Sequence, residues 1–399
     1  MNQLTAIAKN TYLQTVRQPL YGIIVLVTLG GLAMAPSLTG WTLDDDNKML
    51  RDIGLSTLLI QGLFLACFAA SSLLNTEIDD KTVLTVAAKP VSRAAFILGK
   101  YLGLLGALAT AHYLAGIAFF MAMRHGVLQT ARDTSDVTVM ILGPGLMLLL
   151  AIAAVTLNYV YDRRFLPTLI ALALPFGTLS TVILLVVDRD WQLQTYEVAQ
   201  SMDHLPPQVV DNASLKGIIA FCPLEGERQI EGHRGHLVRK AWRGPISEAD
   251  HEYLLSLSDE LQWKKDVNFL VQSARELQGV EIFKAGLLVL VALVVLLSVA
   301  LAASTRLGMF STFLICLIVL SAGLSADQII KPLAEEGEFW ADVLYRIIPN
   351  FQCFWMMDPL SEYRVIPWSY IASATGYGVL YSVAILLFGM ALFETREVG

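Results

Sequence analysis

An acidic-then-basic segment, residues 77–100, has the charge pattern best suited to binding a charged partner. Asp79 and Asp80 favour the start of a helix, because carboxylates stabilise the positive end of the helix dipole. Pro90 interrupts that helix and Ser92 can cap the next one. We therefore predict a compact knob, with a solvated loop as the alternative. The residues expected to face a partner or support the knob are Glu77, Asp79, Asp80, Lys81, Lys89 and Arg93.

Motifs for catalysis and nucleotide binding do not occur in the sequence. There is no G-x-x-x-x-G-K-[ST] phosphate loop, and Gly99-Lys100 lacks the upstream glycine that such a loop needs. Neither H-E-x-x-H nor G-x-S-x-G occurs, and no Cys or His spacing resembles a zinc site. We expect a chain that is not an enzyme and that holds no catalytic residue, metal or cofactor of its own.

The remaining reactive side chains favour structural roles. Cys67 and Cys316 lie in apolar runs, where a thiol behaves as a small apolar group. His112 also lies in such a run and is expected to hydrogen-bond a neighbouring helix. Cys222 and Cys353 both fall on the predicted outer side of the membrane, so a disulfide between them stays open as an alternative in an oxidising compartment.

Composition indicates the environment in which these residues must be positioned. The chain has 399 residues, of which 55% are hydrophobic and 16% charged, and its mean hydropathy is +0.58. Soluble domains carry about 25% charged residues, so this chain is too apolar for an ordinary soluble enzyme or a disordered chain. The net charge of −7 argues against nucleic acid as a partner. A membrane protein in contact with lipid is predicted.

Long uncharged runs give the predicted membrane spans. A helix of about 20 apolar residues crosses a bilayer, and each run is at least that long. We predict eight spans, at residues 20–39, 53–76, 101–123, 137–161, 165–187, 285–305, 307–326 and 365–393.

The basic residues predict the orientation of these spans. With the N-terminus inside, the short inside segments hold ten basic and six acidic residues, and the short outside segments hold seven basic and thirteen acidic. Basic residues favour the cytoplasmic side. Both termini are therefore expected in the cytoplasm of a cell with the chain in its inner membrane. No cleavable signal peptide is predicted, because the first twenty residues lack an apolar core.

Residues 188–284 are predicted to form an extracytoplasmic α+β domain. Its first half has short apolar stretches at 217–222 and 236–242 that indicate strands. Its second half has helical periodicity, with a C-cap expected at Gly279. The apolar face of this helix packs on the domain's own core, or alternatively on the membrane surface or a partner. That face comprises Trp263, Val267, Leu270, Ala274 and Leu277.

Residues 1–19 are predicted to form an amphipathic helix at the cytoplasmic surface. Pro19 is expected to end it before the first span. Its apolar side holds Leu4, Ala8, Tyr12, Thr15 and Val16, and its polar side holds Gln3, Asn10, Gln14 and Arg17. The pattern fits an interfacial elbow or a simple anchor.

Three segments together resemble one known family. Residues 81–82, 89–93 and 99–103 look like the coupling-helix region of ABC-2 type transporter permeases, nearest the branch of nitrous-oxide-reductase maturation and gliding motility. Residues 10–19 resemble that family's connecting helix. Residues 348–398 resemble its outer re-entrant segment and last helix. The chain departs from the family's usual six spans, and an inserted hairpin, residues 165–305, accounts for the extra two.

The resemblance implies a function that needs partners. It implies a permease subunit, an exporter, that pairs with a second copy or a paralogue. A separate cytoplasmic ATPase would bind ATP and Mg and push on the segment 77–100, where Gly99, Gly103 and Gly106 allow close helix approach. Arg163 and Arg164 are secondary contact candidates, with topology determinants as the alternative.

The outer segment, residues 327–364, has two interpretations. Its aromatic residues fit an interfacial belt, whereas the resemblance implies re-entrant helices that gate the pathway. The gate residues would be Trp340, Pro349, Asn350, Phe351, Phe354 and Trp355. A different class stays open for the whole chain: a scaffold or force-transmitting subunit that recruits an extracytoplasmic protein without moving a substrate. The predicted organisation is completed by spans at 20–187 and 285–326 and by a last span with a cytoplasmic tail at 365–399.

Overall fold

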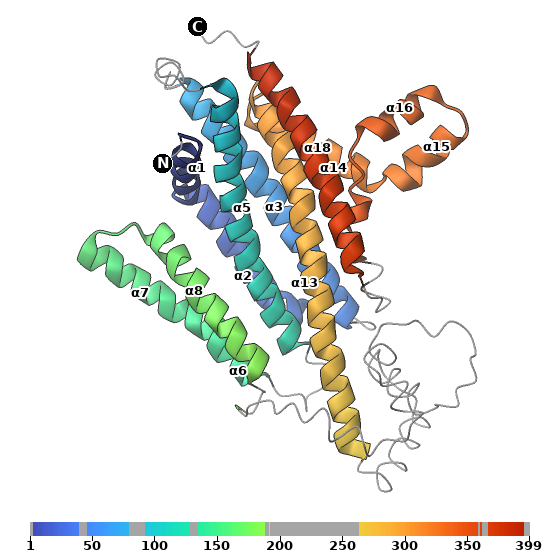
Figure 1. Cartoon of the computed structure of the whole chain (residues 1–399). Coiled ribbons are helices and arrows are strands. Elements are labelled where there is room, and N and C mark those ends of the chain that lie inside the picture. The colour runs from blue at the N-terminus through green and yellow to red at the C-terminus, as the bar shows by residue number, and fades with distance from the viewer. Residues whose placement is uncertain are drawn as a thin grey trace.

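The computed structural model describes residues 3–39, 46–79, 92–127, 135–187, 191, 263–357, 360 and 366–394. Every regular element among them is a helix, as predicted for a polytopic membrane protein (Figure 1). Seven of these helices are long and apolar enough to cross a membrane, or eight if one bent pair counts as a single span.

The helices follow one another along the chain with these bounds: α1 (Gln3–Val16), α2 (Pro19–Thr39), α3 (Asp46–Asp79), α5 (Arg93–His125), α6 (Val137–Met140), η1 (Ile141–Gly145), α7 (Leu146–Tyr161), α8 (Phe165–Val186), α13 (Trp263–Ser304), α14 (Met309–Leu324), η2 (Ala326–Ile330), α15 (Lys331–Glu335), α16 (Phe339–Ile347), η3 (Gln352–Phe354) and α18 (Trp368–Glu394). Of the short elements, η1 and η2 are π-helical and η3 is a 3₁₀ turn.

Helix α13 forms the centre of the bundle. It packs on α3, α5, α14 and α18 (Figure 1), and Leu288, Leu293 and Leu296 on it are fully buried. Leu58 of α3 and Leu104 of α5 belong to the same core. Apolar side chains occupy nearly every side of this helix, which is the pattern of a helix enclosed by others.

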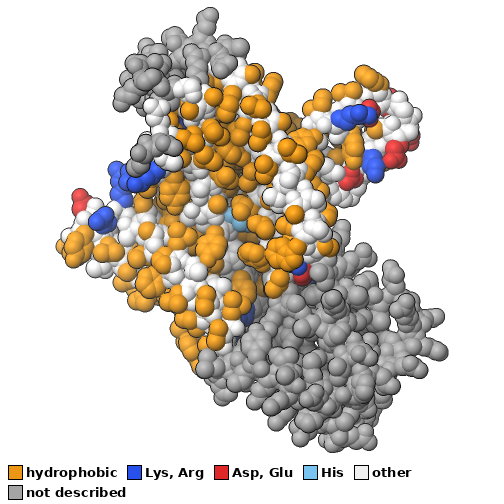
Figure 2. All heavy atoms as spheres, viewed as in Figure 1, with side chains coloured by type: hydrophobic (Ala, Val, Ile, Leu, Met, Phe, Trp, Pro, Cys, Tyr) orange, Lys and Arg blue, Asp and Glu red, His pale blue; other side chains and the backbone are white. Residues whose placement is uncertain are grey.

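The hairpin of α7 and α8 stands apart from this bundle (Figure 1). It reaches α5 mainly through α8, and many of its large apolar side chains are exposed. Figure 2 shows that side chains between the helix ends are almost all hydrophobic on the visible face. A surface of this kind suits lipid contact. The π-helical turn η1 contains Pro144, which lacks the N–H that a regular α-helix requires.

The predicted seventh span, residues 307–326, is not a full span by itself. Helix α14 has 16 residues, and the chain bends by 58° before η2 and α15. An α-helix of that length covers about 24 Å, less than the roughly 30 Å of a hydrocarbon core. The structure therefore has a broken span or a re-entrant segment here.

One predicted helix end is wrong. Helix α13 is unbroken across Gly279, which is therefore not a C-cap, and it also continues across residues 284–285, where the outer domain was predicted to end. Helix α3 extends to Asp79, and the helix predicted to start at Asp79 and Asp80 lies, from residue 80 on, outside the described residues. The apolar face predicted from Trp263 onward is helical in its backbone. Of the predicted outer α+β domain, residues 188–262 lie outside the described residues except Trp191.

Candidate functional site

Helix α1, at the position of the predicted elbow, lies along the N-terminal half of α5. Gly103 makes this possible, because a Cβ there would lie 2.5 Å from both the Ala8 carbonyl oxygen and Thr11 Cβ. Thr11, Thr15 and Val16 are buried in the contact. The link to α2 is short, and Pro19 begins α2 rather than only ending α1.

Helix α2 is held against α5 by a buried hydrogen bond. The Tyr21 hydroxyl donates to the Ala107 carbonyl at 2.9 Å. Gly99 lets α1 approach α5 closely, since a Cβ there would lie 2.7 Å from the Ile7 Cγ2. The elbow, the first span and α5 are thus tied together next to the predicted coupling segment.

The predicted coupling residues are only partly placed. Glu77 and Asp79 lie in the last turn of α3, and Arg93 is the first residue of α5, with only backbone described for all three. Ser92 caps α5 as predicted, since its Oγ accepts from the Ala95 N–H at 3.2 Å. Asp80, Lys81 and Lys89 lie outside the described residues, as does the knob predicted around them.

The secondary candidates lie at the turn between α7 and α8. Asp162 adopts a left-handed φ of 50° there, and Arg164 is the N-cap residue of α8. Asn158 Nδ2 donates to the Arg163 carbonyl and closes the turn. Both arginine side chains are exposed, so the turn presents two cations at the surface.

A polar network closes the bend after α14. Asp327, in η2, accepts hydrogen bonds from the Tyr345 hydroxyl at 2.8 Å and from Asn350 Nδ2 at 2.9 Å. The Asn350 N–H in turn donates to the Tyr377 hydroxyl of α18 at 2.9 Å. The Phe351 N–H donates to the Gly323 carbonyl at 3.1 Å, so the returning chain is bound to the end of α14. Four segments are therefore joined through one carboxylate and one amide.

The six predicted gate residues fall into two groups. Asn350, Phe351 and Phe354 are held inside the structure, with both phenylalanines only 1% exposed, and Pro349 lies against Gly323. Trp340 instead lies on the arm formed by α15 and α16, which projects from the bundle (Figure 1), and is 54% exposed. The structure therefore does not bring Trp340 together with the others.

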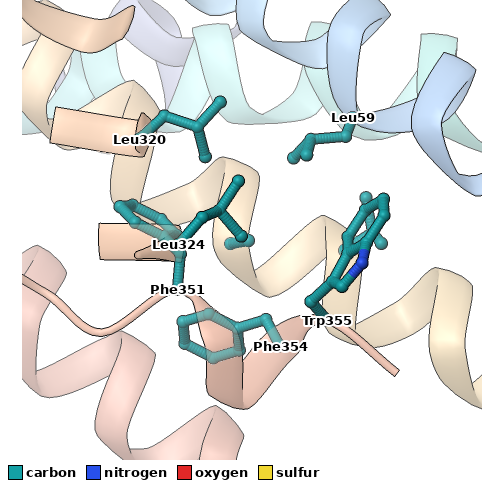
Figure 3. Close-up of a pocket in the computed structure, with 8 residues that line it drawn as sticks. Leu59, Leu320, Leu324, Phe351, Phe354 and Trp355 are labelled. Atoms are coloured by element: carbon teal, nitrogen blue, oxygen red, sulfur yellow. The ribbon is translucent and has the colours of Figure 1, made fainter. Parts of the chain in front are cut away.

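Trp355 lines a small cavity with Phe351 and Phe354 (Figure 3). The other lining residues come from α3, α13 and α14, and Leu59, Leu320 and Leu324 among them point into the same space. The cavity volume is about 10 Å³, which is the room needed for a single water.

A second polar cluster, absent from the sequence-based expectations, joins α13 to the chain just before α18. Lys284 Nζ donates to Glu281 and to the Ile366 carbonyl, the latter at 3.0 Å, and the Ile366 N–H donates to Glu281 at 2.7 Å. Both charged side chains are at most 5% exposed. The sequence could have indicated this pair, because Glu281 and Lys284 carry opposite charges three residues apart just before a predicted span.

Two groups near the bend have shifted pKa values. The hydrogen bond to Asp327 raises the pKa of Tyr345, because ionisation would place two negative charges together. Burial raises the pKa of the Cys353 thiol to about 11, and its Sγ–H donates to the Asn350 carbonyl at 3.0 Å. Cys353 is a free thiol in the structure, while Cys222 lies outside the described residues.

Helix α5 is tied to α13 inside the bundle. His112 Nε2 lies 2.9 Å from the Gly286 carbonyl, which confirms the predicted helix-to-helix hydrogen bond. The Tyr101 hydroxyl donates to the Val294 carbonyl at 3.2 Å. Within the described ranges, no three His, Cys, Asp or Glu side chains come together as a metal site. The polar groups of His112 and Tyr101 instead hold α5 and α13 in a fixed relative position.

Comparison with known protein families, with curated proteins and with solved structures found no match to this chain.

Proposed function

We propose that the chain is the permease subunit of an ATP-driven transporter of the ABC-2 type, working as an exporter. It would pair with a second copy or a paralogue, and a separate ATPase would supply the ATP and Mg chemistry. The observation that carries the proposal is the packing of α1 across the N-terminal half of α5, the helix that follows segment 80–91 in the sequence. A push on that segment would move the elbow and α5 as one body.

The contacts of α5 support transmission of such a push across the membrane. Helix α5 is a single helix of 33 residues, fixed to α13 by the His112 and Tyr101 hydrogen bonds. Helix α13 packs on α18, and α18 holds the re-entrant chain through Tyr377. Rigid packed helices respond to a load by shifting between discrete arrangements. These contacts form a continuous path from α5 through α13 to α18, and we propose that motion is transmitted along it.

The closed cavity at Trp355 and Phe354 supports the gate part of the proposal. A pathway that opens only when the partner ATPase drives the change must be closed at rest. Phe351, Phe354 and Trp355 would move when the bend after α14 moves, since the Asp327 and Asn350 hydrogen bonds join them. Pro349 belongs to the same unit through its contact with Gly323.

The direct test is co-reconstitution of the chain with the ATPase in proteoliposomes. The variant D79K/D80K should keep ATP hydrolysis and lose its coupling to transport. The control D44K/D45K changes two adjacent acidic residues on the predicted opposite side of the membrane and should stay coupled. Coupled transport by D79K/D80K would overturn the assignment. ATP hydrolysis with capture of an outer protein, and with no transported substrate, would support the scaffold alternative instead.

A further inference from the structure

An open groove of about 430 Å³ lies between the start of α2 and the start of α8. Its volume is in the range of ligand-binding sites. One wall is apolar and comes from both helices, with Ile23, Leu26, Phe165 and Leu166. Two arginines, Arg17 and Arg164, line the same groove. The groove therefore combines cationic groups with a continuous apolar surface.

Local structure fixes this arrangement. Arg17 occupies the tight link between α1 and α2, where its N–H donates to the Leu13 carbonyl at 3.2 Å. Arg164 is held at the start of α8, because its carbonyl accepts from the Thr168 hydroxyl at 2.8 Å. The Leu166 side chain lies directly over Gly22, where a Cβ would clash with it. This contact closes one side of the groove.

The arginines of the groove lack a counter-charge within the chain's described part. Arg17 and Arg164 are exposed, as is the neighbouring Arg163, and none of the three forms an ion pair with a described residue. The one acidic residue adjacent in sequence is Asp162, which forms no salt bridge with them. Figure 2 shows basic side chains gathered at the helix connections, beside a hydrophobic surface.

We propose that this groove binds one anionic phospholipid. The phosphate lies between Arg17 and Arg164, and an acyl chain lies along the wall formed by Ile23, Leu26 and Leu166. Basic pockets between membrane helices recognise lipid headgroups in this way. Two guanidiniums favour an anionic over a zwitterionic headgroup, and the apolar wall favours a lipid over a free phosphate ion. The inference is independent of the transport function proposed above.

Native mass spectrometry of the full chain tests the proposal with phosphatidylglycerol and phosphatidylcholine as probes. Wild type should retain phosphatidylglycerol more tightly than phosphatidylcholine, and excess inorganic phosphate should not displace it. R17Q and R164Q should each weaken retention about fivefold, and the double variant about 25-fold. The control K9Q removes an exposed basic residue of α1 outside the groove and should leave retention unchanged. Equal retention of both lipids by wild type would overturn the proposal.

A variant that keeps every charge gives a second test, which does not depend on whether the arginine variants fold. Leu26→Trp should narrow the groove and lower phosphatidylglycerol retention about tenfold, while Leu38→Trp, at an exposed position of the same helix outside the groove, should not. A photo-reactive phenylalanine analogue at Leu26 should cross-link to lipid. Cross-linking to a second copy of the chain, or unchanged retention in Leu26→Trp, would overturn the proposal.

Discussion

Asn350 donates a hydrogen bond from Nδ2 to Asp327 at 2.9 Å and so joins the returning chain to the bend after α14. The same carboxylate accepts a hydrogen bond from the hydroxyl of Tyr345, which lies on α16 of the arm. Both donors depend on one acceptor side chain. The segment after the bend is therefore fixed by a few directed bonds in addition to its buried phenylalanines.

Asp327→Asn should lower the free energy of unfolding by about 1–3 kcal/mol, because an amide offers one acceptor where two donors need one each. Denaturant unfolding in detergent measures this. Asp342→Asn is the matched control on the same arm, since Asp342 is 46% exposed and pairs with the exposed Arg346. Its effect should stay below about 0.5 kcal/mol. Equal losses in both variants would contradict a structural role for Asp327.

Gly103→Leu should destabilise the protein by about 1–3 kcal/mol or more, because the side chain would force α1 away from α5. Thermal unfolding measures the loss, and proteolysis of the N-terminal helix reports its displacement. Gly116→Leu on the same helix is the control, since no atom lies within 4 Å of a Cβ there. If the two variants unfolded alike, the close approach of α1 would not be the cause.

Glu281→Gln and Lys284→Met should each lower the free energy of unfolding by about 3–5 kcal/mol, since each leaves its partner charged and buried without a counter-charge. The double variant should recover much of that loss. Unfolding free energies of the four proteins give the coupling between the two residues. Arg346→Met breaks an exposed pair with side chains 75% and 46% exposed, and should change stability little. Additive losses in the double variant would argue against the buried pair.

Phe351→Ala should destabilise the fold by about 3–5 kcal/mol, because it empties a fully buried site. Trp340→Ala, at an exposed site on the arm, should change stability by no more than about 0.5 kcal/mol. Unfolding measured in detergent separates the two. A large loss for Trp340→Ala would mean that the arm is covered by something beyond this chain.

Cys353 should react with iodoacetamide slowly at neutral pH and faster as the pH approaches 11. The thiolate is the reactive form, and burial raises the pKa of this thiol to about 11. At pH 8 the rate should be roughly a hundredfold below that of an ordinary exposed thiol. Peptide-level mass spectrometry measures the rate. Labelling that requires prior reduction would instead reveal a disulfide, with Cys222 as the partner to examine.

The membrane spans were predictable because charge is excluded from hydrocarbon, which leaves uncharged runs in the sequence. Helix ends were harder, since α3 and α13 continue past those runs into charged sequence. The Ser92 cap was predictable, because it depends on residues three positions apart. The Asp327 network was not, because its partners lie 18 and 23 residues away and meet only after the chain bends. Local patterns carry no information on such distant pairs.

The unbroken helix α13 has a mechanical consequence. Its 42 residues span about 60 Å, roughly twice the thickness of a hydrocarbon core. Its buried part is anchored by Lys284 and Gly286, about midway along the helix. A small tilt about that point would move the end near Trp263 and the end near Ser304 by similar amounts in opposite directions. The stiffness of a single helix would let motion in the core displace whatever binds the end near Trp263, and would let a load on that end reach the core.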